Sequence, residues 1–411
     1  MKAILVGAGI GGICTALMLS RRGVVCEVYE QASELRELGV GLTLLPHAVE
    51  QFVELGLLPD LDRVAIRSAH LHFMTRRGQA VWDEPRGLAA GYDVPQFFVH
   101  RGKLNGVLHD ALRARAPLAL RLDRRLTDYR DSRGGIIANF VDGEGRAHVA
   151  EGDLLIGADG IHSATRRQMR PEEGASRWSG LMLWRGAVEW PDFLDGASVM
   201  IFGGVHAKFV VYPIAPGRRP GHKLTNWAVI IRLAPDGSEP PSRENWSKVG
   251  DRAELMPYLD RFHSDIVDLK GVVAASETFW QYPMCDREPI DNWTLGRATL
   301  LGDAAHPMYP MGANGASQAI LDARCLADAL ARSGDVEAAL ADYQAERIPK
   351  TTAIVLSNRV GGPEGVIDAV ETRAPDGFAD IEQVMSRTER QAFLTGYAQR
   401  AGFSVAQLAK S

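Results

Sequence analysis

An acidic residue, a loop rich in proline and glycine, and a predicted helix follow one another late in this 411-residue sequence. A short apolar strand is predicted at 298–301, shortly before Asp303, and the helix is predicted to begin near Gly315. The Asp303 carboxylate can accept hydrogen bonds from the hydroxyl groups of a sugar-like chain. Backbone N–H groups at the start of a helix favour an anion, and here they belong to Gly312, Ala313 and Asn314.

That order of elements suits a ligand that carries hydroxyl groups and develops negative charge. A reduced flavin fits this description, because its polyol chain is attached to a ring whose edge becomes anionic. The same residues would also suit a buried turn in which Asp303 is a capping acid without a ligand. Taken alone, the stretch leaves both interpretations open.

A second glycine-rich segment lies near the N-terminus. An apolar strand at 2–6 precedes it, a helix pattern follows it, and the next strand ends at Glu30. In this context a G-x-G-x-x-G loop binds the pyrophosphate of a dinucleotide, and the acid holds a ribose. The motif does not distinguish NAD from FAD, and a purely structural glycine turn is the alternative. The loop consists of Gly7, Ala8, Gly9, Ile10, Gly11 and Gly12.

Two further polar residues follow predicted strands. Arg101 stands at a strand-to-helix junction, which suits a phosphate or ribityl contact and a surface position about equally. Asp159 lies between small residues after the strand 153–156, and Ser163 is placed to cap the next helix. Small neighbours let the backbone approach a ligand closely. The alternative is a simple turn before a capped helix.

The segment from Leu181 to Leu233 is predicted to form an antiparallel sheet with one covered face. Aromatic side chains recur along it, so it is a candidate wall for a flat aromatic ligand, although such side chains also make ordinary core. Arg185 is our candidate partner for a substrate carboxylate, and His206 and Tyr212 are candidate proton acceptors. The candidates for a dry substrate cavity are Trp184, Arg185, Met200, Phe202, Tyr212, Trp227, Tyr282 and Pro307.

The composition is that of an ordinary globular protein, with 46% hydrophobic and 24% charged residues. A net charge of −5 without a long basic run argues against nucleic acid and anionic membranes as partners. The N-terminus enters a strand at once and no apolar stretch reaches the length of a membrane span, so we expect a cytoplasmic protein. The four cysteines lack metal-ligand spacing, which predicts core thiols and no metal site.

The sequence resembles the single-component flavoprotein aromatic hydroxylases in three motifs: Gly7–Gly12 with Glu30, Gly157–Gly160 with Arg166, and Gly302–His306. This group includes p-hydroxybenzoate hydroxylase and salicylate hydroxylase, and the resemblance extends to about residue 360. Longer stretches look like the phenazine-modifying monooxygenases of pyocyanin biosynthesis, among them MLWRGAVE, QYPMCDREP and GDAAHPMYPMGANGASQAILDA.

The resemblance implies an FAD cofactor, with NAD(P)H as a transient co-substrate and O2 as the oxidant. The implied reaction hydroxylates a planar aromatic or N-heteroaromatic substrate, with or without a carboxylate, through a flavin C4a-hydroperoxide. In the family the acid that corresponds to Asp159 serves both FAD and NAD(P)H. The FAD-binding residues implied are Gly7, Gly9, Ile10, Gly11, Gly12, Glu30, Gln31, Val40, Gly41, Arg101, Leu126, Asp159, Asp303, Gly312, Ala313 and Asn314.

The implied fold is α/β, an FAD-binding Rossmann-like domain of the p-hydroxybenzoate hydroxylase type with an inserted antiparallel β-sheet substrate domain and C-terminal helices. A small aromatic molecule would be the partner, and we expect a monomer or homodimer. A helix pattern over 336–360 is interrupted by Pro349. The FAD-binding domain would comprise 1–70, 97–176 and 283–360, the substrate domain 71–96 and 177–282, and a C-terminal helical segment 361–411.

Two other functions stay open from the residues alone. An NAD(P)-dependent dehydrogenase would explain Gly7–Gly12 but would leave Asp159 and Asp303 without a task. A non-catalytic flavin-binding protein would retain the nucleotide motifs without the chemistry. A flavin halogenase is disfavoured because its W-x-W-x-I-P signature is missing, and a hydrolase because no G-x-S-x-G elbow is present.

Overall fold

A six-stranded, mostly parallel sheet carries the three sequence motifs. The computed structural model describes residues 1–35, 40–242, 245 and 247–408. The strand order is β18-β19-β12-β1-β2-β8, and all neighbours are parallel except β18 and β19. The glycine loop, Asp159 and Asp303 follow the ends of β1, β12 and β19, so the sheet brings them to one edge. The strands are β1 (Lys2–Val6), β2 (Val25–Tyr29), β8 (Leu120–Arg121), β12 (Leu154–Gly157), β18 (Thr294–Leu295) and β19 (Ala298–Leu300).

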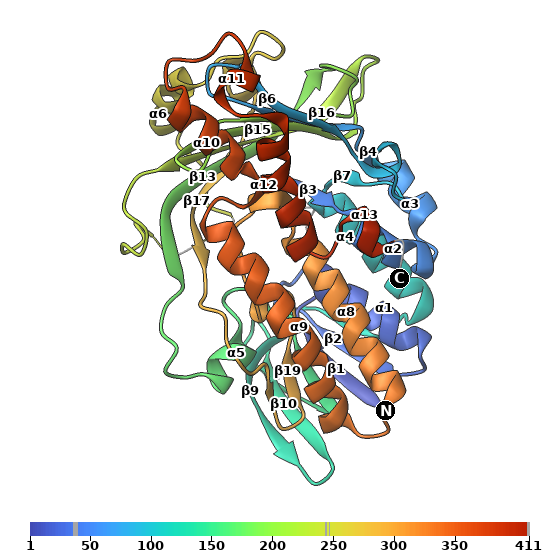
Figure 1. The fold of residues 1–411 in the computed structure, drawn as a ribbon. Helices are drawn as coiled ribbons and strands as arrows, with labels where there is room; N and C mark the ends of the chain where they lie inside the picture. Colours follow the sequence, from blue (N-terminus) through green and yellow to red (C-terminus); the bar gives the residue numbers. More distant parts are fainter. Residues whose placement is uncertain (36–39, 243–244, 246, 409–411) are drawn as a thin grey trace.

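Helices pack beside this sheet (Figure 1). α8 (Gly315–Arg332) packs against both α1 (Ile10–Arg21) and α9 (Val336–Arg359), and α4 (Arg101–Arg115) packs against α1. The predicted interruption at Pro349 is wrong, because α9 continues through it. Buried side chains lie on both sides of the proline, and their packing compensates for the hydrogen bond that proline cannot donate.

A seven-stranded sheet forms the second layer, in the order β17-β13-β16-β15-β14-β5-β6. Neighbours are antiparallel except β14 and β5, which are parallel. The hairpin β5–β6 therefore shares a sheet with the distant segment 177–282. The strands are β5 (His70–Met74), β6 (Ala80–Pro85), β13 (Arg177–Pro191), β14 (Val199–Phe202), β15 (Ala207–Pro216), β16 (His222–Arg232) and β17 (Phe279–Asp286).

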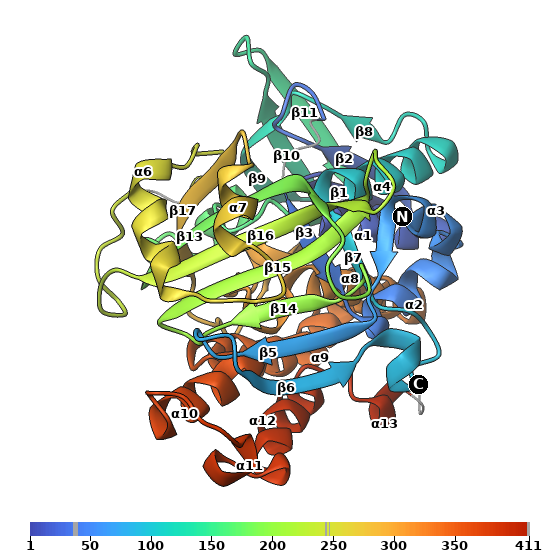
Figure 2. The same ribbon diagram turned by 90° about the horizontal axis from the view of Figure 1, so that it is seen from above.

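The two faces of this sheet are covered by different parts of the chain. α6 (Arg252–Leu255), η2 (Met256–Arg261) and α7 (Leu269–Ala274) pack with one face in a hydrophobic cluster, and Figure 2 shows α6 and α7 in yellow over the strands. The other face looks toward the parallel sheet. The C-terminal helices close the edge at β5 and β6: α10 (Gly365–Arg373), α11 (Ile381–Val384), α12 (Arg387–Arg400) and α13 (Val405–Leu408).

Smaller elements complete the fold. A three-stranded meander consists of β9 (Arg125–Ser132), β10 (Gly135–Val141) and β11 (Ala147–Gly152). A second three-stranded sheet contains β3 (Gly41–Leu44), β4 (Ala65–Arg67) and β7 (Phe97–His100), and connecting helices are α2 (Pro46–Leu55), α3 (Leu58–Val64) and α5 (Ala164–Met169). All four cysteines are buried free thiols, as predicted. Among the described helices, none is both long and apolar enough to cross a membrane.

Candidate functional site

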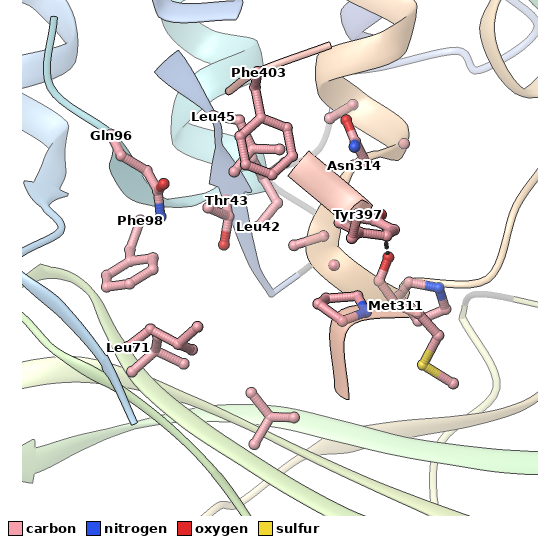
Figure 3. A pocket seen from close by; sticks show the side chains of 18 of the residues that line it. Leu42, Thr43, Leu45, Leu71, Gln96, Phe98, Met311, Asn314, Tyr397 and Phe403 are labelled. Atoms are coloured by element: carbon pink, nitrogen blue, oxygen red, sulfur yellow. Dashed lines mark hydrogen bonds between the residues drawn. The ribbon is translucent and has the colours of Figure 1, made fainter. Parts of the chain in front are cut away.

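A cavity of about 700 Å³ lies between the seven-stranded sheet, the motif-bearing edge of the parallel sheet and the C-terminal helices. Its lining includes Gly9, Ile10 and Gly11 as well as the loop Gly312–Gly315. It therefore joins the first motif to the third. Figure 3 shows side chains that surround this space, namely Leu71, Phe98, Met311, Asn314, Tyr397 and Phe403.

Two close approaches of the backbone determine the shape of the glycine loop. Gly7 has φ +101°, and a Cβ there would lie 2.4 Å from the Ala158 carbonyl oxygen. A Cβ on Gly12 would lie 2.1 Å from the carbonyl oxygen of Gly7. A Cβ on Gly9 would meet nothing within 4 Å. The space beside Gly9, at the start of α1, is thus open for a phosphate group.

Glu30 lies at the end of β2, against this loop. Its two carboxylate oxygens accept hydrogen bonds from the N–H groups of Ala8 and Ala32, both at 2.9 Å. A carboxylate has about four acceptor positions, so capacity for a ribose hydroxyl is left. Gln31 is exposed nearby, whereas Leu126 is buried in a cluster with Tyr29. These three residues lie outside the lining of the cavity, and their part in adenosine binding stays a prediction.

Asp159 has a clear local role. Its carboxylate accepts hydrogen bonds from the Ser163 hydroxyl at 2.5 Å and from the N–H groups of Ala164 and Thr165 at 2.8 and 3.1 Å, which fixes the start of α5. Ser163 also caps that helix, as predicted, by accepting from Arg166 N–H. The two neighbours of Asp159 in the sequence, Ala158 and Gly160, line the cavity. The backbone of this turn, rather than the Asp159 carboxylate, therefore faces a ligand there.

Arg166 connects the second motif to the third. It is buried, and its guanidinium donates to the carbonyl oxygens of Ala304 and Ala305 at 3.1 and 2.7 Å. Asp322 also stabilises the turn formed by the third motif, Gly302–His306. Its carboxylate accepts from Gly302 N–H at 3.0 Å and contacts His306 Nε2 at 2.6 Å. Burial raises the pKa of Asp322, but His306 and Arg347 outweigh that effect and bring it to about 2.

Asp303 is open to the cavity at the tip of this turn. The surrounding protein withdraws water from the carboxylate and raises its pKa, while His306 and Arg101 partly offset the rise. Burial in turn lowers the pKa of Arg101, and Asp303 opposes that shift. Both side chains line the cavity, and the backbone N–H of Arg101 donates to the Val40 carbonyl at 3.0 Å. This pair of opposite charges suits a hydroxylated chain that ends in phosphate.

The loop before α8 adopts left-handed backbone geometry at two successive residues, with φ +67° at Gly312 and +53° at Ala313. Such geometry costs an alanine about 1–2 kcal/mol, so the surroundings must hold it. The Tyr397 hydroxyl donates to the Met311 carbonyl at 3.0 Å, which attaches α12 to this loop (Figure 3). Gly312, Ala313 and Asn314 all line the cavity, as the predicted cofactor loop requires.

Arg185 and Tyr212 are the two predicted substrate residues that line the large cavity. Arg185 donates to the Gly41 carbonyl at 2.6 Å and to the Tyr282 hydroxyl at 3.3 Å, while its Nε has no hydrogen-bond partner among the described atoms. Burial raises the pKa of Tyr212 to about 12, although Arg185 lowers it in part. Tyr212 is therefore a hydrogen-bonding phenol at neutral pH rather than a base.

Four of the side chains predicted to line the substrate cavity lie away from its wall. Trp184 and Trp227 are buried on the other face, where their indole N–H groups bond to Gln281 and Ser276. Successive residues of a strand point to opposite faces, so if Arg185 faces the cavity, Trp184 cannot. The sequence did not reveal which face was which. The residues that lie on the far face are Trp184, Met200, Phe202 and Trp227.

The remaining candidates lie elsewhere. Tyr282 and Pro307 line a smaller pocket of about 80 Å³, which shares Arg185 and Asp303 with the large cavity. His206 is exposed and accepts a hydrogen bond from Arg232 Nε at 2.9 Å. It lies outside the lining of both pockets, so the structure does not support it as a proton acceptor.

Several residues of the cavity wall are not among the predicted site residues. Lys208 faces the cavity from β15. Polar and apolar residues both surround it in the sequence, so the sequence does not indicate which face of the strand it lies on. The C-terminal segment was treated as a separate helical tail, yet it closes the cavity. Its lining residues include Glu364, Leu394, Tyr397 and Phe403.

The comparisons with known proteins agree with this geometry. Residues 1–357 match the FAD binding domain family. The chain is 40% identical to phenazine 1,6-dicarboxylic acid hydroxylase of Lysobacter antibioticus, over 87% of this chain and 88% of that one. It is 30% identical to 3-hydroxybenzoate 6-hydroxylase of Klebsiella oxytoca, over 88% of each chain.

Solved structures share the fold. Klebsiella pneumoniae HpxO in complex with FAD and uric acid matches with a TM-score of 0.75 at 24% identity, covering 100% of this chain and 97% of that chain. A substrate complex of salicylate hydroxylase matches with a TM-score of 0.73 at 19% identity, covering 100% and 97%. The predicted α/β architecture with an FAD-binding domain is thereby confirmed.

Proposed function

The chain belongs to the FAD binding domain family and is an FAD-dependent aromatic monooxygenase, and from this premise we propose that its substrate is a planar aromatic or N-heteroaromatic acid. Two relatives bear names that point the same way, one a hydroxylase of phenazine 1,6-dicarboxylic acid and the other of 3-hydroxybenzoate. The observation that carries the proposal is a partly unsatisfied guanidinium, Arg185, in an otherwise largely apolar cavity wall.

The residues present fit FAD. The open space beside Gly9 would accept the pyrophosphate, and Arg101 and Asp303 would contact the phosphate and ribityl chain. The loop from Gly312 to Asn314 would border the ring, where N–H groups at the start of α8 favour a negative charge. When bound, FAD supplies the redox chemistry by accepting reducing equivalents from NAD(P)H and activating O2.

The protein contributes position and the exclusion of water. Arg185 would pair with the substrate carboxylate, and Tyr212 would hydrogen-bond to the ring substituent beside it. Apolar side chains from β5, β7 and the C-terminal segment would keep the cavity dry, which protects reactive oxygen species from water. We assign no protein base, since an electron-rich ring does not require one.

The proposed reaction also implies a location in the cell and a mode of NAD(P)H binding. NAD(P)H is a cytoplasmic co-substrate, so a cytoplasmic location follows from the proposed reaction. The turn around Asp159 would serve NAD(P)H only transiently.

A panel of aromatic acids, neutral analogues and phenazines tests the proposal. The purified protein should be yellow, and at least one acid should accelerate NAD(P)H oxidation and yield a product heavier by one oxygen atom. If only neutral compounds stimulate oxidation, the substrate class is wrong. If nothing aromatic stimulates it, a non-catalytic flavin-binding role replaces the proposal. A colourless protein that reduces or oxidises NAD(P) would indicate a dehydrogenase.

A further inference from the structure

A lysine is buried in the cavity wall. The side chain of Lys208 is 3% exposed, and it lines the cavity from β15. Its ammonium lies 3.0 Å from the thioether sulfur of Met311, which is a weak acceptor. Its nearest carboxylate is Glu364, whose Oε1 is 3.5 Å away and whose side chain is 6% exposed. An ammonium has three donors, so these contacts leave hydrogen-bonding capacity unused.

Glu364 is poorly satisfied as well. Its Oε1 accepts from Gly312 N–H at 3.4 Å, and its Oε2 has no hydrogen-bond partner among the described atoms. Charge-assisted N–H···O bonds usually measure about 2.7–2.9 Å, so this ion pair is loose. Asp368 adds negative charge nearby. These carboxylates lie beside the ammonium without occupying all of its donors.

The other charged groups of the lining are engaged differently. Arg86 forms a direct ion pair with Glu84 at 2.8 Å. Arg101 and Asp303 lie together at the predicted ribityl position. Among the residues that the structure describes, Arg185 and Lys208 are thus the two cations of the sheet that face the cavity with spare donors.

The distance between these two cations follows from the register. β16 lies between β13 and β15, and its residues Ala228 and Ile230 pair with Arg185 and Lys208 respectively. With strands about 4.8 Å apart and about 3.4 Å per residue along a strand, the two Cα atoms are about 12 Å apart. Long flexible side chains from those positions can reach opposite ends of a flat ring system.

We infer that Lys208 is a second anion-binding residue, which selects aromatic substrates bearing two carboxylates at opposite ends of the ring system. The inference rests on the proposed function, because Arg185 would hold the first carboxylate. The second carboxylate of the substrate accepts hydrogen bonds from the N–H donors of Lys208 that Glu364 does not engage. A monocarboxylate leaves the buried lysine with its loose contacts, so it binds more weakly.

Matched pairs of probes test this assignment on the FAD-loaded enzyme. Benzoate and terephthalate form one pair, and the phenazine mono- and dicarboxylates form another. Binding is measured from the change in the flavin absorbance spectrum. On at least one scaffold the dicarboxylate should bind about tenfold to a hundredfold more tightly than the monocarboxylate, as expected for one charged hydrogen bond.

Variants assign that preference to the lysine. Lys208→Met should abolish the preference, and Lys208→Arg should keep most of it. Lys223→Met is the matched control, because Lys223 lies on the same sheet, paired with Asp192 outside the cavity lining. It should behave like wild type. FAD content identifies any variant that fails to fold.

Three results would overturn the assignment. One is a dicarboxylate preference that survives Lys208→Met, and another is wild-type enzyme that shows no preference on any scaffold. In either case monocarboxylates still bind and stimulate NAD(P)H oxidation, so the proposed function stands. The third is failure of every acid to bind the wild-type enzyme, which overturns the proposed function and this inference together.

Discussion

The ring of Tyr397 packs directly against Gly312, so closely that a Cβ on Gly312 would lie 2.4 Å from the tyrosine Cζ and Oη. One residue belongs to the predicted flavin loop and the other to α12, near the C-terminus. The Tyr397 hydroxyl also bonds to the carbonyl of Met311 and to Asn358 Oδ1, at 3.0 and 3.2 Å. The C-terminal helix is therefore part of the site and holds the loop in its left-handed geometry.

Replacing Gly312 tests that contact. Gly312→Ala combines a positive φ of +67° with a steric clash, so both stability and FAD affinity should fall. The left-handed geometry alone should cost about 1–2 kcal/mol of unfolding free energy. Removing the ring in Gly312→Ala/Tyr397→Ala should relieve the clash, so the two changes should be non-additive. Additive losses within about 0.5 kcal/mol would show that the ring does not support the loop.

Asp303 is predicted to hold the ribityl chain. Asp303→Ala should remain folded but lose about tenfold to a hundredfold in FAD affinity, the value of one charged hydrogen bond. Glu30→Ala provides the contrast, because it should weaken FAD binding yet leave turnover at saturating FAD within a few-fold of normal. Equilibrium titration with FAD measures both. Unchanged FAD affinity in Asp303→Ala would refute its role.

Arg185 is predicted to pair with the substrate carboxylate. Arg185→Met should raise KM for an aromatic acid by about tenfold or more, through loss of a charged hydrogen bond. A neutral analogue should lose much less. Because Arg185 also donates to the Gly41 carbonyl, FAD affinity must be measured alongside. Equal losses for the acid and its neutral analogue would mean that Arg185 only supports the fold.

Local chemistry in the sequence predicted the cofactor side of the site well. Gly7 and Gly12 are neighbours in the chain, so the close approach of Gly12 to the Gly7 carbonyl follows from short-range geometry. Ser163 capped its helix for the same reason. The parallel sheet then brought Asp303 to the same edge as the glycine loop, as the order of elements implied.

The substrate side was harder to predict because it depends on long-range packing. A one-residue shift in the register of a strand moves its side chains to the opposite face of the sheet. Because β13 has apolar residues on both faces, its sequence does not indicate which face lines the cavity. The aromatic face turned out to pack on α7, and the face with Arg185 and Lys208 formed the cavity. Tyr397 and Phe403 close the cavity although they lie far along the chain from the strands that form its wall. No local sequence pattern could indicate such a contact.

His47 should make the folded state sensitive to acid. It is 2% exposed, and burial, followed by the charge of Arg347, lowers its pKa to about 3. The unfolded chain titrates near pH 6.5, so below that pH the unfolded state binds the extra proton and stability falls. Between pH 7 and pH 5 this group alone should cost about 2 kcal/mol.

Chemical denaturation at both pH values measures that loss. His47→Gln should reduce the difference between pH 7 and pH 5, whereas the exposed control His263→Gln should leave it unchanged. An equal pH dependence in wild type and His47→Gln would show that His47 is not the group responsible.

Incorporation of isotopically labelled dioxygen tests the central claim, that this chain is an FAD-dependent aromatic monooxygenase, most directly. The FAD-loaded enzyme is supplied with NAD(P)H, labelled O2 and the aromatic acid that best stimulates NAD(P)H oxidation, and the product is analysed by mass spectrometry. A monooxygenase should place one labelled oxygen atom in each product molecule and reduce the other oxygen atom to water. A product that carries unlabelled oxygen from water, or NAD(P)H oxidation that yields only hydrogen peroxide with every aromatic acid, would contradict the claim.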